Sequence, residues 1–525
     1  MSDHRIHGIN LHSRYNPQRE ASRYFDNRPM GSSSGVYIFI EPGEGYLSRE
    51  LLHRYPEALA LEIHCDQIFQ NDDIPGSLYC WDPSSSSSLK KFLSSHIADY
   101  DLGLVQIVEW EPSRKAYGPL YEEILRTVLS FLQERRGSVH TTGTFGYRWL
   151  KNVFRRVLTM SSVAAAAPVH LPVLIAASGP TLASSIPLIR RFRDSLSIWA
   201  LPSSIQSLLH ENIVPDLVVH TDPGFYARFH LDSFPQQSGL KTPVASPLNA
   251  GVPVHGLPYI PLNTGTPIEE FVLQALSLPS VRTIQHGTVA GTALYTAFAL
   301  SPLPVFFSGL DLSFDDIRGH CRPHSFDRLF LSSNRRIQPL THIYYDRSPR
   351  SYRSERSDST GRQNFALKRY EDWFSSLPSD PNRAIYRLFP THTGIPSFID
   401  VDSSKDFEKI MYGLSENSQV LGSDPRSSII HSEYAIDCIQ GSAVLREYIS
   451  SVRTQCTRLC RARTDIAELP LLEEFISFCC YSELFRLNPA SWKYGPRLKS
   501  ADVSELCSLL THRLDQIDFF LKNTG

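Results

Sequence analysis

A short glycine-containing turn, Ser178-Gly179-Pro180-Thr181, offers the first recognisable chemistry in this sequence. It follows the apolar run 173–177 and leads into a helical pattern of apolar residues, so it joins a strand to a helix. Such a turn exposes backbone N–H groups at the helix N-terminus, where they can bind an anion. The turn therefore predicts either a phosphate site or only a tight turn. No lysine follows the glycine as it does in a Walker loop, so ATP hydrolysis is not expected.

Two acids and a second glycine turn recur at comparable places further along the chain. Asp222 lies just past the apolar part of the expected strand 215–223, and Asp311 follows the expected strand 303–308. Gly287 and Thr288 belong to a glycine/threonine turn that opens another helix. The alternation of strands and helices predicts a doubly wound α/β sheet with two helix N-termini and two acids on one rim, where open sheets contact their ligands.

The N-terminal part of the chain shows the same order of elements. An expected strand at 36–40 is followed by Gly43 and Gly45, by an apolar helical pattern, and by a strand at 58–63 that carries Glu62 near its end. This order is typical of nucleotide-binding α/β units, but the third glycine of the dinucleotide motif is missing. We therefore expect a Rossmann-like domain in which the glycines only form a tight turn. An S-adenosylmethionine methyltransferase with Glu62 on a ribose is the alternative.

The length of 525 residues predicts about three domains. We expect a Rossmann-like α/β domain at 1–140, a central doubly wound α/β domain at 141–400 and a C-terminal α-helical domain at 401–525, where apolar residues recur at helical spacing. The arginine-rich run at 347–362 is too polar for a core and predicts either a solvated loop or a lid over a bound ligand.

Charge and hydropathy limit the classes of partner. The formal net charge is −2, with 52 Lys and Arg against 54 Asp and Glu, so nucleic-acid binding is not expected. The first 30 residues lack the apolar stretch of a signal peptide. The apolar candidate for a membrane span, 163–177, is short and contains two prolines, so we expect no membrane segment and a cytoplasmic protein.

The motifs of the central domain, taken in order, resemble those of the Maf (motility accessory factor) flagellin glycosyltransferases. The resemblance is close over 170–330 and looser over the rest of the chain, and the glycine turn at Gly43 and Gly45 is similar to the first domain of that family. It rests on the following ordered segments: Ala177-Ser178-Gly179-Pro180-Thr181-Leu182, Ala200-Leu201-Pro202, Pro215-Asp216, Thr221-Asp222-Pro223, Gly287-Thr288-Val289-Ala290 and Ser308-Gly309-Leu310-Asp311-Leu312.

The resemblance implies a central catalytic domain related in fold to bacterial sialyltransferases. It implies transfer of a nonulosonic acid, of the pseudaminic or legionaminic type, from a CMP-sugar to Ser or Thr hydroxyls of flagellin, a step required for flagellar assembly and motility. The single phosphate of that donor suits a helix N-terminus without a Walker lysine. The implied donor-binding residues are Ser178, Gly179, Pro180, Thr181, Asp222, Gly287, Thr288 and Asp311.

The acceptor hydroxyl needs a base within hydrogen-bond reach. The family has a histidine soon after its Gly-Leu-Asp-Leu segment, which makes His320 the first candidate and His324 the second. The sequence departs from the usual spacing here, because both histidines follow that segment, so the choice between them is open. A metal shared by His320, His324 and Asp311 is not expected, because Pro323 interrupts a regular helix through the two histidines.

Two other functions compete with this one. The same central domain is similar to an archaeal hydroxymethyl-pterin pyrophosphokinase, which would use ATP and would place magnesium on Asp222 and Asp311, whereas the glycosyltransferase requires no cofactor. A non-catalytic flagellin-binding factor is the second alternative. The sequence leaves open the sugar, the modified flagellin residues, the stereochemistry of transfer and the oligomeric state.

Overall fold

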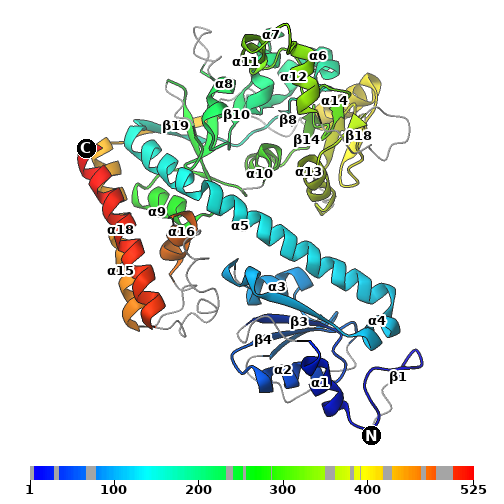
Figure 1. The fold of residues 1–525 in the computed structure, drawn as a ribbon. Coiled ribbons are helices and arrows are strands. Elements are labelled where there is room, and N and C mark those ends of the chain that lie inside the picture. Colours follow the sequence, from blue (N-terminus) through cyan, green and yellow to red (C-terminus); the bar gives the residue numbers. More distant parts are fainter. Residues whose placement is uncertain are drawn as a thin grey trace. The chain divides into compact units, whose positions relative to one another are not determined.

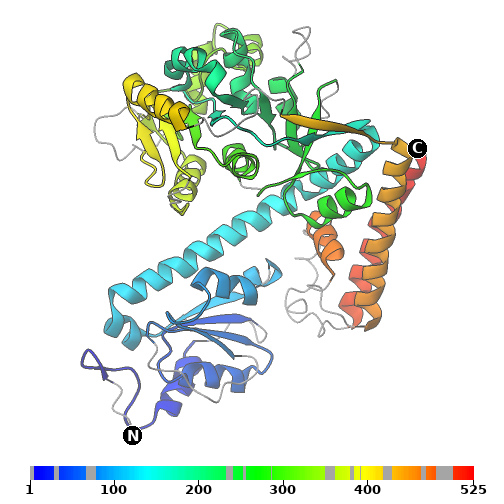
Figure 2. The same cartoon turned by 180° about the vertical axis from the view of Figure 1, so that it is seen from behind.

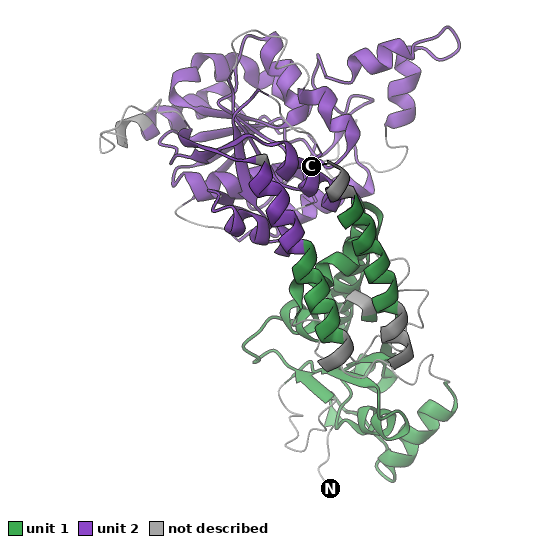
Figure 3. Ribbon diagram, turned by 90° about the vertical axis from the view of Figure 1, so that its left-hand side faces the viewer, with its two compact units in different colours: residues 1–147, 449–520 green, residues 148–448, 521–525 purple. Residues whose placement is uncertain are grey.

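The structure is a computed structural model, and its described residues form two compact units (Figure 3). Unit 1 comprises Met1–Tyr147 and Ile449–Phe520, and unit 2 comprises Arg148–Tyr448 and Leu521–Gly525. Most of the arginine-rich run at 347–362 lies outside the described residues. The described residues are 5–28, 35–66, 78–97, 99–231, 241–251, 256–284, 287–348, 361–378, 383–390, 392–417, 429–462, 469–479 and 500–524.

Unit 1 is built on a small parallel sheet with the strand order β5-β4-β3-β6. Its strands are apolar because helices cover the sheet. Strand β6 lies on the opposite side of β3 from β4, so the strand order reverses between β3 and β6. This arrangement confirms the Rossmann-like prediction. The elements are α1 (Pro17–Asp26), β3 (Val36–Ile40), α2 (Tyr46–Arg54), β4 (Leu59–Ile63), β5 (Leu78–Trp81), α3 (Leu89–His96), β6 (Val105–Glu109) and α4 (Glu111–Tyr117).

A long helix, α5 (Pro119–Thr159), continues past residue 140, where the sequence predicts the first domain boundary. The helix contains three glycines, Gly137, Gly143 and Gly146. Glycine disfavours a helix by only about 1 kcal/mol, which tertiary packing can offset. At Gly146 the helix lies so close to Phe478 that a Cβ would stand 2.7 Å from the Phe478 Cα. Glycine at this position therefore allows α5 to pack closely against Phe478.

Unit 2 contains a nine-stranded sheet in the order β13-β12-β11-β10-β9-β8-β14-β17-β18, and all its neighbouring strands are parallel. This confirms the doubly wound prediction. The strands are β8 (Val173–Ala176), β9 (Ser197–Ala200), β10 (Leu217–Val219), β11 (Val244–Pro247), β12 (Tyr259–Asn263), β13 (Val281–Arg282), β14 (Val305–Ser308), β17 (Ile385–Leu388) and β18 (Ile399–Val401).

Helices cover both faces of this sheet (Figures 1 and 2). One face packs against α10 (Val289–Leu300) and α13 (Phe365–Ser375), and the other against α6 (Leu182–Arg191), α7 (Ile205–His210) and α14 (Ser404–Asn417). The two buried clusters explain why the strands read as continuous apolar runs. They also hold the carboxyl ends of the strands in fixed positions.

The segment from 401 onward is mostly helical, as the apolar periodicity predicts. Its first helix, α14, and the strand β19 (Ile430–Ala435), which pairs antiparallel with β7 (Ser162–Ala166), belong to unit 2. The later helices are α15 (Cys438–Ala462), α16 (Pro470–Cys479) and α18 (Ser500–Thr524). Residues 401–525 are thus divided between the two units. Among the described helices none is long and apolar enough to cross a membrane.

Candidate active site

The strand order of the large sheet reverses between β8 and β14. These two strands are neighbours, with Ala176 paired to Ser308, but the chain leaves β8 toward β9 on one side and reaches β14 on the other. Loops that leave such a switch point diverge and open a crevice at the carboxyl ends of the strands. Both the turn after β8 and the loop after β14 start here, and together they carry the residues expected to act.

Hydrogen bonds join these two loops closely. The Gly179 N–H donates to the Gly309 carbonyl oxygen at 2.8 Å. The Thr181 N–H and hydroxyl donate to the two carboxylate oxygens of Asp311 at 2.9 and 2.5 Å. A Cβ on Gly179 would stand 2.5 Å from the Gly309 oxygen and would also collide with the Asp311 carboxylate, so only glycine fits. Gly309 itself has a positive φ of 71°.

The Asp311 carboxylate therefore occupies the N-terminus of α6. It takes the place that the sequence assigned to the donor phosphate, because the N–H groups of Gly179 and Thr181 are already bonded within the protein and Pro180 has none. Burial raises the pKa of Asp311, opposed by the bonds from Thr181 and by the charge of Arg387. In this structure the turn is a tight junction of two loops, and Asp311 faces that junction.

A buried arginine supports the junction from the neighbouring strand. Arg387 in β17 is 1% exposed and forms an ion pair with Asp400 at 3.0 Å. It also donates to the Thr393 hydroxyl at 3.0 Å, and that hydroxyl donates to the Asp311 carbonyl oxygen at 2.9 Å. Sequence reasoning missed this set. The signal was an arginine inside an otherwise apolar run, Ile385-Tyr386-Arg387-Leu388.

Three histidines gather beside the same junction. The rings of His320 and His324 stack with centroids 4.4 Å apart and planes 7° apart, and Nδ1 of His320 lies 3.0 Å from the Ser178 hydroxyl. The third is His230 in α8 (Arg228–Leu231), whose ring meets His324 edge-on at 5.4 Å. The structure thus brings both sequence candidates together with Ser178. His230 was missed; its signal was a histidine among aromatic residues soon after Asp222.

The two stacked histidines differ in which ring nitrogen is engaged. In His324, Nδ1 accepts the Phe326 N–H at 3.3 Å, so the proton of the neutral ring is assigned to Nε2. That Nε2 is buried and has no hydrogen-bond partner among the described residues. In His320, Ser178 engages Nδ1, and the residue is exposed to solvent. His320 can therefore contact a ligand from the solvent side. His324 is buried and stacks against the His320 ring.

Burial keeps all three imidazoles neutral near pH 7. It lowers the pKa of His324 to about 2, with His320 and His230 adding to the shift, and lowers the pKa of His230 to about 4. The pKa of His320 is also lowered, by desolvation on its protein side, while Asp327 and Ser178 oppose the shift. Neutral imidazoles can accept or donate a proton but do not bring a positive charge to the site.

The remaining sequence candidates lie on the same rim of the sheet. Asp222 is exposed, and its carboxylate accepts the Gly224 N–H at 2.6 Å. Its negative charge partly opposes the lowering of the His230 pKa by burial and by His320, so the carboxylate lies near the histidine group. The strand before Asp222, β10, lies three strands from β14. At a spacing of about 4.8 Å per strand, the two strands that precede Asp222 and Asp311 are roughly 14 Å apart in the sheet.

The second glycine turn opens α10. Thr288 is its N-cap, and the Thr288 hydroxyl accepts the Ala290 N–H at 3.3 Å. A Cβ on Gly287 would lie 3.5 Å from the Tyr370 ring of α13, an ordinary contact. Because β13 runs parallel to the other strands, this helix N-terminus lies on the rim where the strands end.

Comparison with a solved structure identifies the architecture. The chain superposes on the structure of a Maf glycosyltransferase from Magnetospirillum magneticum AMB-1 with a TM-score of 0.60, over 99% of this chain and 91% of that one, at 11% sequence identity. The chain has the Maf fold. Residues 148–316, which carry most of the site, also match the family model of 6-hydroxymethylpterin diphosphokinase MptE-like proteins. An uncharacterized protein of Treponema pallidum (strain Nichols) is 29% identical over 414 residues, which is 77% of this chain and 85% of that protein.

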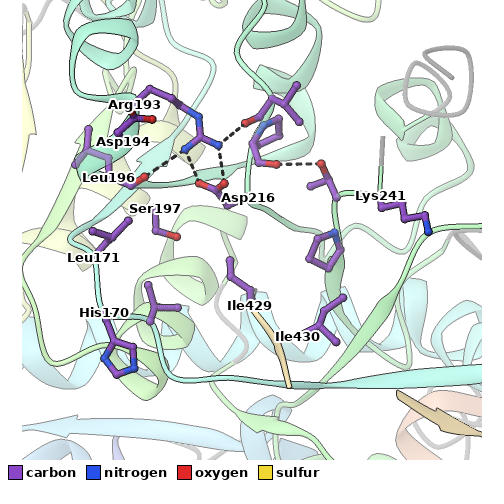
Figure 4. Close-up of a pocket in the computed structure, with 15 residues that line it drawn as sticks. His170, Leu171, Arg193, Asp194, Leu196, Ser197, Asp216, Lys241, Ile429 and Ile430 are labelled. Carbon is purple, nitrogen blue, oxygen red and sulfur yellow. Dashed lines mark hydrogen bonds and ion pairs between the residues drawn. The ribbon is translucent and has the colours of Figure 1, made fainter. Parts of the chain in front are cut away.

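The Maf fold of this chain also holds a cavity of about 540 Å³ that the sequence did not predict (Figure 4). It lies at the amino ends of the strands in unit 2, on the rim opposite to the histidines, and Ile429 and Ile430 form part of its wall. Within it Arg193 and Asp216 form a paired contact with N–O distances of 2.6 and 3.1 Å. This ion pair satisfies two of the charged side chains that line the cavity, and Asp194 and Lys241 line it as well.

Proposed function

We propose that this protein is a glycosyltransferase that moves a nonulosonic acid, of the pseudaminic or legionaminic type, from a CMP-sugar to Ser or Thr hydroxyls of flagellin in the cytoplasm. The observation that carries the proposal is the stacked pair of His320 and His324, joined to Ser178 at the switch point of a Maf fold. The transfer supports flagellar assembly and motility. It requires no cofactor, nucleic acid or membrane.

In this proposal His320 is the base. It is exposed and neutral, and Ser178 holds the ring through Nδ1, which leaves Nε2 to accept the proton of the acceptor hydroxyl. As the hydroxyl oxygen bonds to the anomeric carbon, the bond from that carbon to the phosphate oxygen breaks. CMP leaves with the electron pair, and the proton stays on His320.

His324 is a positioning residue and hydrogen-bond donor rather than the base. Its Nδ1 is engaged by a backbone N–H, and its pKa of about 2 makes it a poor proton acceptor. Its Nε2–H can donate a hydrogen bond to an oxygen of the bound CMP-sugar. This proposal takes His320 as the base, a choice that the sequence leaves open between the two histidines.

The donor phosphate is assigned to the N-terminus of α10, with Gly287 and Thr288, and to the Ser178 hydroxyl. The N-terminus of α6 is filled by Asp311, whereas α10 is a 12-residue helix that begins on the same rim with a small, exposed glycine before it. Asp222 lies near His230, and we assign it to bind the hydroxyl groups of the sugar. Gly179, Pro180, Thr181 and Asp311 then shape the crevice without touching the phosphate.

Binding measurements on the full chain test this proposal. Calorimetric titration with CMP is expected to show binding without magnesium, and the variant Gly287→Asp is expected to weaken it at least tenfold by placing a negative charge before α10. The matched variant Gly413→Asp, at an exposed position in α14 with no atom near its Cβ, is expected to bind CMP as the unmodified protein does. Equal CMP affinity in both variants would contradict the assigned phosphate site.

A pterin diphosphokinase is the second candidate, favoured by the match of residues 148–316 to the MptE-like family model. It would transfer a diphosphate from ATP to a pterin alcohol and release AMP. Magnesium-dependent binding of ATP in the absence of CMP binding would support it. Binding of flagellin without binding of either nucleotide would instead indicate a non-catalytic flagellin-binding factor.

A further inference from the structure

A second group of chemically competent residues lies in unit 1, at the carboxyl end of the small sheet. Glu62 in β4 and Cys80 in β5 are direct partners across the two parallel strands, and His64 follows β4 immediately. Within the described part of the chain, this is the one group of three His, Cys, Asp or Glu residues whose ligand atoms all lie within 4.8 Å of one another.

The distances between these atoms fit a tetrahedral metal. Nε2 of His64 lies 3.2 Å from Oε2 of Glu62, and Sγ of Cys80 lies 3.4 Å from the same oxygen. Zinc–ligand bonds of about 2.0–2.1 Å to nitrogen and oxygen and about 2.3 Å to sulfur place tetrahedral N–O and S–O pairs about 3.3 and 3.5 Å apart. The three side chains therefore stand almost where such an ion would hold them.

The surroundings orient each ligand. Oε1 of Glu41 lies 3.6 Å from Nδ1 of His64, and the Cys65 N–H holds its other oxygen at 2.7 Å. A carboxylate behind the second nitrogen of a histidine is the usual partner of a metal-bound imidazole. The Ser48 hydroxyl donates to Oε1 of Glu62, which turns Oε2 toward His64 and Cys80.

The surroundings of Glu62 also exclude the methyltransferase alternative, in which this carboxylate would bind a ribose. This residue is 5% exposed, and both of its carboxylate oxygens are hydrogen-bonded to protein groups. Neither oxygen is therefore available to accept a hydrogen bond from a ribose hydroxyl. The His12 ring fills the turn beside Glu62. A Cβ on Gly43 would stand 2.5 Å from Nε2 of His12 and would clash with it, and that ring is hydrogen-bonded to the Pro42 carbonyl oxygen at 3.0 Å.

We propose that Glu62, His64 and Cys80 bind a divalent cation of the zinc class. Nε2 of His64, Oε2 of Glu62 and the Cys80 thiolate are the ligands, the thiol losing its proton to solvent when the metal binds. Glu41 positions His64. Three protein ligands leave the fourth tetrahedral position to water or to a ligand atom. The same atoms without a metal would form a protonated His64 between two glutamates, with Cys80 as a thiol.

Cobalt is the probe that separates these two arrangements. The full chain, stripped with a chelator, is titrated with Co²⁺, and we expect one equivalent to produce the visible bands of tetrahedral cobalt and a thiolate-to-cobalt charge-transfer band. Zn²⁺ should abolish both and raise the temperature of thermal unfolding. Absence of a stoichiometric charge-transfer band in the unmodified protein would overturn the proposal, whatever the variants do.

Variants then assign the ligands. Cys80→Ser is expected to lose the charge-transfer band, and Glu41→Gln to weaken cobalt binding by about 10–100-fold while keeping the band. The control is Cys65→Ser, a buried thiol next to the site that is outside the ligand set and should keep both the band and the affinity. Far-UV circular dichroism checks that each variant is folded. A band that survives in folded Cys80→Ser would also overturn the proposal.

Discussion

At the scale of residues, the site depends on positions that accept only one residue type. Gly179 is one of them, because a Cβ there would collide with the backbone of the facing loop. The sequence predicted a turn at this position and could not distinguish a phosphate cradle from a tight junction. The deciding neighbour, Asp311, lies 130 residues beyond Thr181, to which it is hydrogen-bonded, and no local sequence pattern predicts that bond.

Replacing Gly179 by alanine should destabilise unit 2. We expect a cost of about 1–3 kcal/mol, since the Gly309 carbonyl oxygen is backbone and must move. The change is measured as a lower urea midpoint of unfolding. The matched control is Gly413→Ala in α14, where no atom lies near the new Cβ and the helix gains up to about 1 kcal/mol. Equal midpoints for the two variants would show that the junction is not tight.

The buried histidines predict a dependence of stability on pH. The pKa of His324 is lowered to about 2 in the folded chain, against about 6.5 when unfolded, so the unfolded chain binds the extra proton first. The neutral histidine costs no stability above pH 6.5, and stability falls as the pH drops from there toward 2. His324→Phe should lessen this fall while keeping the aromatic stack. Unfolding midpoints between pH 7 and 4 measure it, with exposed His210→Ala as control; parallel curves for all three proteins would refute the assignment.

At the scale of elements, apolar runs predicted several strands of the large sheet, including β8, β10 and β14, and the strands β3 and β4 of the small sheet. Strands β11, β12, β17 and β18 were not identified, because their apolar runs are short and contain proline, asparagine, arginine or aspartate. Their place in the sheet comes from pairing with distant strands. The missed strand β17 carries Arg387, so the support of the site was missed along with it.

Arg387 ties β17 to β18 and to the loop of Asp311. Replacing it by methionine leaves Asp400 without its buried partner and should cost about 3–5 kcal/mol. The exposed Arg191, which pairs with Glu408 at the surface, gives the matched variant Arg191→Met, for which we expect little change. The readout is the thermal midpoint of unfolding. A loss as small as that of Arg191→Met would mean that the ion pair does not hold the strands together.

At the scale of the whole molecule, the sequence predicted an α/β chain with a helical C-terminal part, and its motif order pointed to the Maf fold that the structure has. Residues 449–520 share a compact unit with the N-terminal residues, which no local pattern reveals. The fold leaves the chemistry open, since the same region matches a diphosphokinase family. The assignment of function therefore depends on the histidines of the site.

The most direct test is the mass of flagellin after incubation with this protein and CMP-pseudaminic or CMP-legionaminic acid. We predict a mass increase of one or more nonulosonic acid residues, a kcat reduced about 10²–10⁴-fold in His320→Ala with little change in KM, and full activity in His210→Ala. Unmodified flagellin with both donors, or a His320→Ala variant as active as the unmodified protein, would contradict the account.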